Sequence, residues 1–157
     1  MTQAESDERA VEHEVDVAGV REWVAAWGRE VAAVEMSIAR ARFEPGLIAF
    51  GTHADVVVGL DQVEADQWSQ VWPNIEDFRF RVELMKVVLS PDRLAAVVAV
   101  PWDSTGFDES GVSFPRPGRA TIVVRRADGG APWRGIHTHF SLARGVPPRT
   151  FGRPRSR

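Results

Sequence analysis

The sequence predicts an α+β domain in which helices come first and an antiparallel sheet follows. Apolar residues recur three and four positions apart between Val20 and Ile38, which is the period of a helix with one buried face. From Phe78 onward the chain alternates polar and apolar residues or forms short β-branched runs, the patterns of strands. Two of these runs, within residues 119–142, predict a closing hairpin around a Gly-rich turn.

The composition limits the classes of protein to which this chain can belong. Its 157 residues are 44% hydrophobic and 26% charged with a formal net charge of -3, as in a soluble domain with its own core. No basic field for nucleic acid and no apolar run for a bilayer is present, so we expect neither partner. The sequence has no cysteine, phosphate loop or dinucleotide fingerprint, so we expect no disulfide and no cofactor. The first residues lack a signal pattern, which favours a cytoplasmic location.

The two ends of the chain carry opposite charge. Residues 1–18 are acidic, which is typical of a flexible tail or a frayed helix start. Residues 144–157 are rich in arginine and broken by prolines, which prevent a helix. We therefore expect a folded domain over residues 19–143 between two flexible tails. A second reading of the basic end is that it binds an acidic partner, or the acidic start of a neighbouring subunit.

The first helix is expected to place Trp23 and Trp27 on its apolar stripe. Tryptophans at this spacing are more often core residues than parts of a pocket wall. The helical region should end near Pro45, because proline lacks the amide donor that a helix needs. Both roles, core and pocket wall, stay open for Trp27.

A short second helical region is expected after two short strands at residues 47–50 and 56–60. Asp61 is placed to cap this helix, which should bury Trp68 and end at Pro73. His53 falls in the loop between the two strands.

The sheet region begins with residues 78–89, which alternate long enough for one long strand. Residues 94–102 form a nearly continuous apolar run, which indicates a central strand covered on both faces. Residues 103–118 then read as a long loop rich in Gly, Ser and Pro, and such loops are often functional. Phe107 on this loop suggests a flap over an apolar site.

The last strand of the hairpin contains the paired histidines of the chain. Alternation places His137 and His139 on one face, and Thr138 and Phe140 on the other. Either face can be the buried one. If Phe140 and its neighbours point toward the helices, both histidines point outward, toward a partner subunit.

The hairpin resembles that of the nuclear transport factor 2-like superfamily, in the SnoaL-like branch that includes the association domain of calmodulin-dependent kinase. The resemblance rests on Arg119-Ala-Thr-Ile-Val, Asp128-Gly129, Trp133 and His137-Thr-His-Phe-Ser141, and weakens back to about Val20. It implies a cone of N-terminal helices packed on a curved antiparallel sheet, with a pocket between them. It also implies a homodimer across the sheet, which would cover an exposed apolar face.

The resemblance to the kinase association domain also implies a pocket arginine at Arg119. A buried arginine needs an anion, so the expected ligand is a small apolar compound with a carboxylate or carbonyl group. A histidine beside it could move a proton near neutral pH. Candidate catalytic residues are therefore His137, His139 and Arg119. Candidate ligand-binding residues are Trp27, His53, Trp68, Trp102, Asp103 and Phe107.

Two functions remain open. The first is a cofactor-free isomerase, cyclase or dehydratase acting on a small carbonyl or carboxylate compound. The second is a non-catalytic ligand-binding or dimerisation module of the same fold. The chain has no tyrosine, which excludes the Tyr-plus-acid oxyanion arrangement of ketosteroid isomerases. A metal site is not expected, because a pair of histidines on one strand face needs a third ligand and none stands out.

Overall fold

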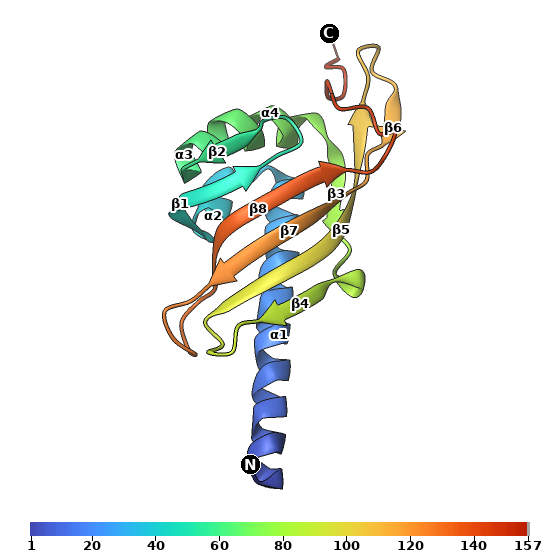
Figure 1. Ribbon diagram of the computed structural model, residues 1–157. Coiled ribbons are helices and arrows are strands. Elements are labelled where there is room, and N and C mark those ends of the chain that lie inside the picture. Colours follow the sequence, from blue (N-terminus) through green and yellow to red (C-terminus); the bar gives the residue numbers. More distant parts are fainter. Residues whose placement is uncertain (157) are drawn as a thin grey trace.

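In the computed structural model, which describes residues 1–156, a long helix crosses one face of a curved open sheet and shorter helices cover its end (Figure 1). The helical elements are α1 (Gln3–Ala33), α2 (Met36–Arg40), α3 (Leu60–Val63), the π-helical turn η1 (Glu64–Trp68), α4 (Ser69–Val71) and the 3-10 turns η2 (Trp72–Asn74) and η3 (Val82–Leu84). The strands are β1 (Phe43–Phe50), β2 (Val56–Val58), β3 (Glu76–Phe80), β4 (Lys86–Leu89), β5 (Ala95–Phe107), β6 (Ser113–Pro115), β7 (Gly118–Arg125) and β8 (Arg134–Leu142). The predicted α+β class is confirmed.

The sheet is mixed rather than wholly antiparallel. Its main order is β2-β1-β8-β7-β5-β3, and β4 and β6 pair with further parts of β5. The expected hairpin is formed by β7 and β8, which pair antiparallel, but β1 runs parallel to β8. No tight turn joins β1 to β8, so the hairpin geometry that forces antiparallel pairing does not apply to them.

The core lies between α1 and the inner face of the sheet, the face that α1 covers. Trp27 on α1 is 1% exposed and packs on Phe43 of β1 and on Phe140 of β8, with ring centroids 4.9 and 5.6 Å apart. The helical period predicted from Val20 is therefore present, and it buries large aromatic side chains that dominate the packing energy.

Several local predictions for the sheet were wrong. Residues 78–89 are divided between β3 and β4 by the turn η3, and each part pairs with a different end of β5. β5 is buried at alternate residues only, so one of its faces is uncovered. The expected loop 103–118 is mostly hairpin, because β5 continues to Phe107 and turns into β6.

The expected cap at Asp61 is also wrong. Gly59 occupies the cap position of α3, and no side chain caps this helix. Asp61 instead pairs with Arg40 at the end of α2. An arginine charge nearby is a stronger partner for a carboxylate than a backbone amide at a short helix.

Within residues 1–156, the two segments expected to be flexible tails, residues 1–18 and 144–157, contribute a helix and several contacts. Residues 3–18 form the first half of α1, which begins with a capping box between Thr2 and Glu5 and extends beyond the sheet (Figure 1). At the other end, Thr150 donates to the Asn74 carbonyl at 2.6 Å and accepts from the Phe107 amide at 3.0 Å. The C-terminal segment therefore folds back on η2 and the end of β5.

Asp16 fixes α1 to the sheet through a buried ion cluster. Its carboxylate is 3% exposed and pairs with Arg93 at 2.6 Å and with Arg126 at 2.9 Å. The Arg126 guanidinium in turn lies 4.2 Å from the ring centroid of Trp133. The hydrogen bond from Arg93, assisted by Arg126, holds the pKa of Asp16 below its ordinary value.

None of the helices in residues 1–156 has the length and apolar character needed to cross a bilayer.

Asp16→Asn should lower the free energy of unfolding by about 3 kcal/mol, because it leaves the buried Arg126 charge without a carboxylate. The contribution of Asp16 to stability should be fully present above pH 3.8, its unfolded value, and be lost as the pH falls through its lower folded-state pKa. Urea unfolding at pH 7 and at pH 3 measures both effects. Glu12→Gln is the control, since Glu12 pairs with Arg93 while 42% exposed and should cost little. Equal losses for the two variants would contradict this account.

Candidate functional site

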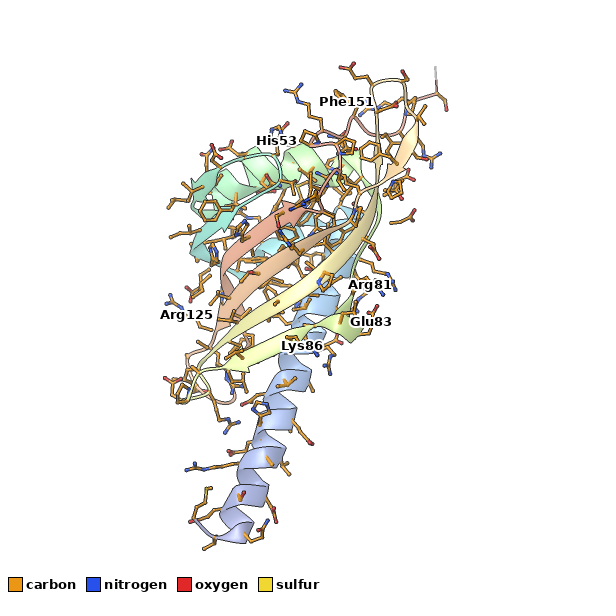
Figure 2. The ribbon with its side chains drawn as sticks, turned by 45° about the vertical axis from the view of Figure 1, so that its right-hand side comes forward. His53, Arg81, Glu83, Lys86, Arg125 and Phe151 are labelled. Atoms are coloured by element: carbon orange, nitrogen blue, oxygen red, sulfur yellow. The ribbon has the colours of Figure 1, made fainter. Side chains whose placement is uncertain are left out.

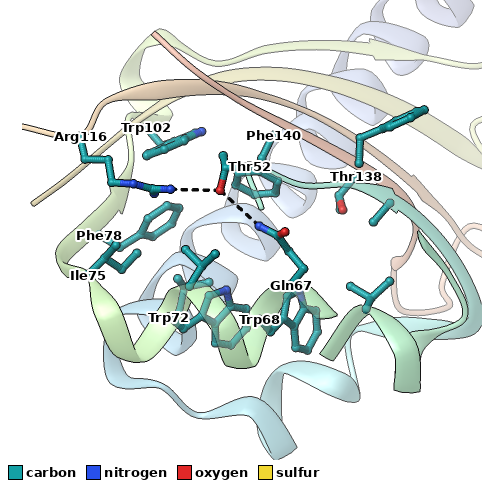
Figure 3. Close-up of a pocket in the computed structure, with 15 residues that line it drawn as sticks. Thr52, Gln67, Trp68, Trp72, Ile75, Phe78, Trp102, Arg116, Thr138 and Phe140 are labelled. Atoms are coloured by element: carbon teal, nitrogen blue, oxygen red, sulfur yellow. Dashed lines mark hydrogen bonds between the residues drawn. The ribbon is translucent and has the colours of Figure 1, made fainter. Parts of the chain in front are cut away.

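An enclosed pocket lies between the inner face of the sheet and the segment α3–η1–α4 (Figure 3). Its cavity volume is about 30 Å³, which is room for one or two water molecules, so the side chains nearly fill it. Most of the lining is aromatic or aliphatic. The side chains labelled in Figure 3 are Thr52, Gln67, Trp68, Trp72, Ile75, Phe78, Trp102, Arg116, Thr138 and Phe140.

Flat rings form two walls of this pocket. On the helical side, Trp68 and Trp72 stack with centroids 4.5 Å apart and an interplanar angle of 19°. On the sheet side, Trp102 of β5 and Phe140 of β8 point inward, because strand alternation places them with the buried residues. A flat apolar molecule is the shape that such walls would hold.

Arg116 brings a positive charge into this apolar pocket. It lies between Pro115 and Pro117, in the connection from β6 to β7. Ser104 of β5 fixes its backbone on both sides, because the Ser104 carbonyl accepts from the Arg116 amide at 2.8 Å and the Ser104 hydroxyl donates to the Arg116 carbonyl at 2.7 Å. The arginine is 2% exposed, and its guanidinium carbon lies 5.9 Å from the ring centroid of Trp102.

No acidic side chain pairs with the Arg116 guanidinium in the part of the chain that the structure describes. Its Nη2 donates to the Thr52 hydroxyl at 3.1 Å, and its Nε, which is buried, has no partner among these residues. Burial alone lowers the pKa of Arg116 to about 10, so the group remains charged at neutral pH. An uncompensated buried charge of this kind favours an anionic ligand.

Thr52 and Gln67 complete the polar side of the pocket. The Gln67 side-chain nitrogen donates to the Thr52 hydroxyl at 3.3 Å, so that oxygen accepts from both Gln67 and Arg116 (Figure 3). The Gln67 oxygen accepts from the amides of His53 and Ala54 at 3.1 and 3.2 Å. Gln67 lies in η1, and π-helical turns are frequent at functional sites.

Trp102 has an unpaired donor of its own in the described chain. Its indole nitrogen is buried and has no hydrogen-bond partner among residues 1–156. Trp23 and Trp27 also have buried indole nitrogens without a described partner, but they belong to the core and do not line the pocket. A Cβ at Gly118 would lie 2.6 Å from Trp102 Cε2, the carbon bonded to this nitrogen, so the nitrogen edge of the ring lies against β7.

A second hollow of about 170 Å³ adjoins Arg116 on its outer side. Arg116 and Val71 line both spaces, so we call this hollow the outer basin; it is bordered by His53 and by the C-terminal residues Arg149 and Phe151. Figure 2 shows His53 and Phe151 at the same end of the molecule. The outer basin contains arginine and histidine side chains and no carboxylate among its described residues.

The predicted catalytic residues lie outside this pocket. His137, His139 and Arg119 are on the outer face of the sheet, opposite the face covered by α1. His137 contacts the Ile48 carbonyl at 2.8 Å through Nδ1, and Arg119 contacts the Ser141 hydroxyl at 3.3 Å. No group of three metal-binding side chains occurs within residues 1–156. The alternation had left two orientations open, and the structure has the one that buries Thr138 and Phe140.

The predicted ligand-binding residues are divided among several regions. Trp68 and Trp102 line the pocket, and His53 borders the outer basin. Trp27 is in the core, and Asp103 is on the outer side of β5, 3.8 Å from Arg79 and from Arg81. Phe107 is buried under the C-terminal segment, with the Arg153 guanidinium carbon 5.5 Å from its ring centroid. The structure therefore brings together only three of the six.

The prediction from sequence missed Arg116, Gln67 and Thr52. Gln67 gave a signal, because it falls at helical spacing between the buried Val63 and Val71, where a polar residue needs a buried partner. Arg116 gave almost none. It lies between two prolines in a stretch read as a loop, and nothing local shows that this arginine, and not Arg119 three residues later, points inward.

Comparisons with known proteins agree with the architecture. A family model described as a SnoaL-like domain matches residues 20–145. A search of curated proteins finds no match for this chain.

Solved structures show the same fold at low identity. A ketosteroid isomerase-like protein from Erwinia carotovora atroseptica has 16% identity and a TM-score of 0.70, over 84% of this chain and 98% of that one. A nuclear transport factor 2-like superfamily protein from Salmonella enterica serovar Typhimurium has 14% identity and a TM-score of 0.70, over 85% and 96%. A nuclear transport factor 2-like protein with a cystatin-like fold from Novosphingobium aromaticivorans has 15% identity and a TM-score of 0.67, over 92% of each chain. At these identities the likeness concerns the fold alone.

Proposed function

The chain belongs to the SnoaL-like domain family, and from that premise we propose that it binds a small, flat organic anion in the Arg116 pocket. The anion is a carboxylate, or an enolate formed from a carbonyl compound. The observation that carries the proposal is the buried Arg116 guanidinium, which has no acidic partner in the described chain. A ligand carboxylate supplies the missing charge and accepts more than one of its N–H groups.

The apolar lining supports a ligand with a ring or a short hydrocarbon body. Trp72, Phe78 and Phe140 offer surfaces that gain from burying such a group, since each Å² removed from water contributes about 25 cal/mol. The cavity of about 30 Å³ is smaller than an aromatic acid, so binding requires the lining to move apart. The outer basin is the direction in which it can open, because Arg116 borders both spaces.

Binding without catalysis is favoured over proton transfer by the lining itself. Among the pocket residues of the described chain, Arg116 is the only one that titrates, and a guanidinium with a pKa of about 10 is a poor general base at neutral pH. One observation favours catalysis as a second candidate. His53 lies in the outer basin with Arg116, where it could remove a proton beside a bound carboxylate, as an isomerase, cyclase or dehydratase requires.

We further propose that the protein is a homodimer through the outer face of the sheet. That face exposes a set of apolar side chains that water would otherwise contact, with Ile48, Phe50 and Val97 each more than 40% exposed. Contiguous apolar surface on an open sheet is typical of an interface. In this arrangement His137 and His139 are interface residues, not catalytic ones.

Arg116→Met should weaken carboxylate binding and stabilise the free protein at the same time. Methionine removes the buried charge, which should raise the free energy of unfolding by about 2 kcal/mol. Isothermal titration with phenylacetate should show binding to the wild type and a loss of at least about tenfold in the variant. Phenylacetamide, the uncharged analogue, and Arg119→Gln, a change on the outer face, are the controls. Retained phenylacetate affinity in the Met variant would refute the pocket assignment.

The catalytic candidate is tested with phenylpyruvate, which has a ring, a carboxylate and an enolisable methylene group. If His53 acts as a base, the wild type speeds exchange of the methylene protons in D₂O. His53→Gln should then slow this exchange by about 100-fold without changing phenylpyruvate affinity. Proton NMR follows the exchange. A wild type that binds phenylpyruvate without accelerating exchange would leave the protein as a binding module.

Val97→Asp should convert the proposed dimer to a monomer, because it places a carboxylate in the middle of an apolar interface. Light scattering coupled to size-exclusion chromatography measures the mass, which should fall to half. Val112→Asp is the matched control, since Val112 is 61% exposed in the β5–β6 turn, away from the outer face. A wild type of monomeric mass would disprove the proposal.

A further inference from the structure

We propose that the Thr52 hydroxyl occupies the anion position of the pocket in the free protein, and that a ligand carboxylate displaces it. This inference rests on the proposed function and adds to it the atoms of the anion subsite, Arg116 Nη2 and Gln67 Nε2. It also assigns a role to the loop after β1, residues 51–55, which Thr52 joins to the pocket. Thr52 is then a residue that selects for charge, not one that binds the ligand.

Two donors converge on one oxygen at this point. The Thr52 oxygen lies 3.1 Å from Arg116 Nη2 and 3.3 Å from Gln67 Nε2, and the two side chains reach it from opposite sides of the pocket (Figure 3). A hydroxyl oxygen is a modest acceptor for a guanidinium. A carboxylate oxygen at the same place would accept both hydrogen bonds with full charge assistance. The geometry that holds Thr52 is therefore the geometry that would hold an anion.

Threonine at position 52 suits a partner of Arg116 that a ligand must displace. An Asp or Glu at position 52 would pair with Arg116 permanently and exclude an anionic ligand. A residue without an acceptor would leave the buried guanidinium with no hydrogen bond from this loop. Threonine satisfies one N–H and remains weak enough for a carboxylate to replace.

The loop is attached to the pocket mainly through side chains. Besides Thr52, its hydrogen bonds to the pocket run from the amides of His53 and Ala54 to the Gln67 oxygen, while the Gly51 amide bonds the Ala54 carbonyl at 3.2 Å within the loop. Gln67 can approach because residue 51 is glycine: a Cβ there would lie 2.0 Å from the Gln67 carboxamide carbon. Releasing Thr52 removes the one described hydrogen bond between this loop and Arg116.

The position of the loop links this exchange to entry. Thr52 lines the inner pocket and His53 borders the outer basin, so the loop lies between the two spaces. Arg116 borders both spaces as well. An anion arriving in the basin can meet Arg116, displace Thr52 and enlarge the cavity of about 30 Å³, whereas a neutral molecule cannot compete for the guanidinium.

The direction in which Thr52→Val changes phenylacetate affinity tests whether the ligand displaces the Thr52 hydroxyl. Valine has the same shape without the hydroxyl, so Arg116 no longer has a partner to give up, and phenylacetate should bind roughly threefold to tenfold more tightly than to the wild type. Thr121→Val is the matched control, because Thr121 is exposed on β7 opposite the outer-face His139, does not line the pocket and should leave the affinity within about twofold. Isothermal titration with phenylacetate and phenylacetamide measures both variants.

Each possible result of these titrations either supports or overturns the displacement of Thr52. Tighter phenylacetate binding by the Thr52 variant, with no gain for phenylacetamide, supports displacement. Weaker binding would mean that Thr52 contacts the ligand, and unchanged binding would mean that it does not compete; both overturn the inference while the Arg116 pocket stands. If the wild type and both variants fail to bind phenylacetate or any other small carboxylate tested, the proposed function itself fails and the inference falls with it.

Discussion

The uncompensated charge of Arg116 is the constraint on which the site depends. A guanidinium that is 2% exposed among aromatic rings costs free energy unless something satisfies it, and the described chain offers only the Thr52 hydroxyl and the face of Trp102. Such an arrangement is poor for stability and good for binding an anion. The pKa of Arg116 is lowered for the same reason, because burial destabilises the charged guanidinium.

The sheet fixes the position of Arg116 through strand β5. Ser104 on β5 forms hydrogen bonds with both the backbone amide and the backbone carbonyl of Arg116. Strand β5 is in turn paired with β3, β4, β6 and β7. Gly106 lets Phe114 and Arg116 pack close to β5, because a Cβ there would lie 2.7 Å from Phe114 Cζ and 3.0 Å from the arginine Cδ. The opposite wall is the helical segment, where η1 turns Gln67 inward. Strand pairing holds β5 on both sides, whereas the loop of residues 51–55 is attached mainly through side chains. The loop is therefore the part of the pocket that can move.

Sequence reasoning found the architecture because its signals are local. The helical stripe around Trp27, the β-branched strand before the Asp128-Gly129 turn and the alternation of β8 each follow from near neighbours. The site depended on facts that are not local. A bulge beside Val123 and Val124 and the covering by α1 decide that Phe140, and not His139, points inward. Which arginine is buried depends on the β5–β6 hairpin and its connection to β7, and the sequence pattern of these residues predicts only a loop.

The central claim is that an anion belongs at Arg116, and the most direct test is a crystal structure of the protein with phenylacetate bound. The ring should lie against Trp102 and Phe140, and one carboxylate oxygen should lie within hydrogen-bond distance of Arg116 Nη2 and Gln67 Nε2, with Thr52 moved away. Phenylacetate on the outer face beside Arg119 and His139, with Thr52 still bonded to Arg116, would contradict it.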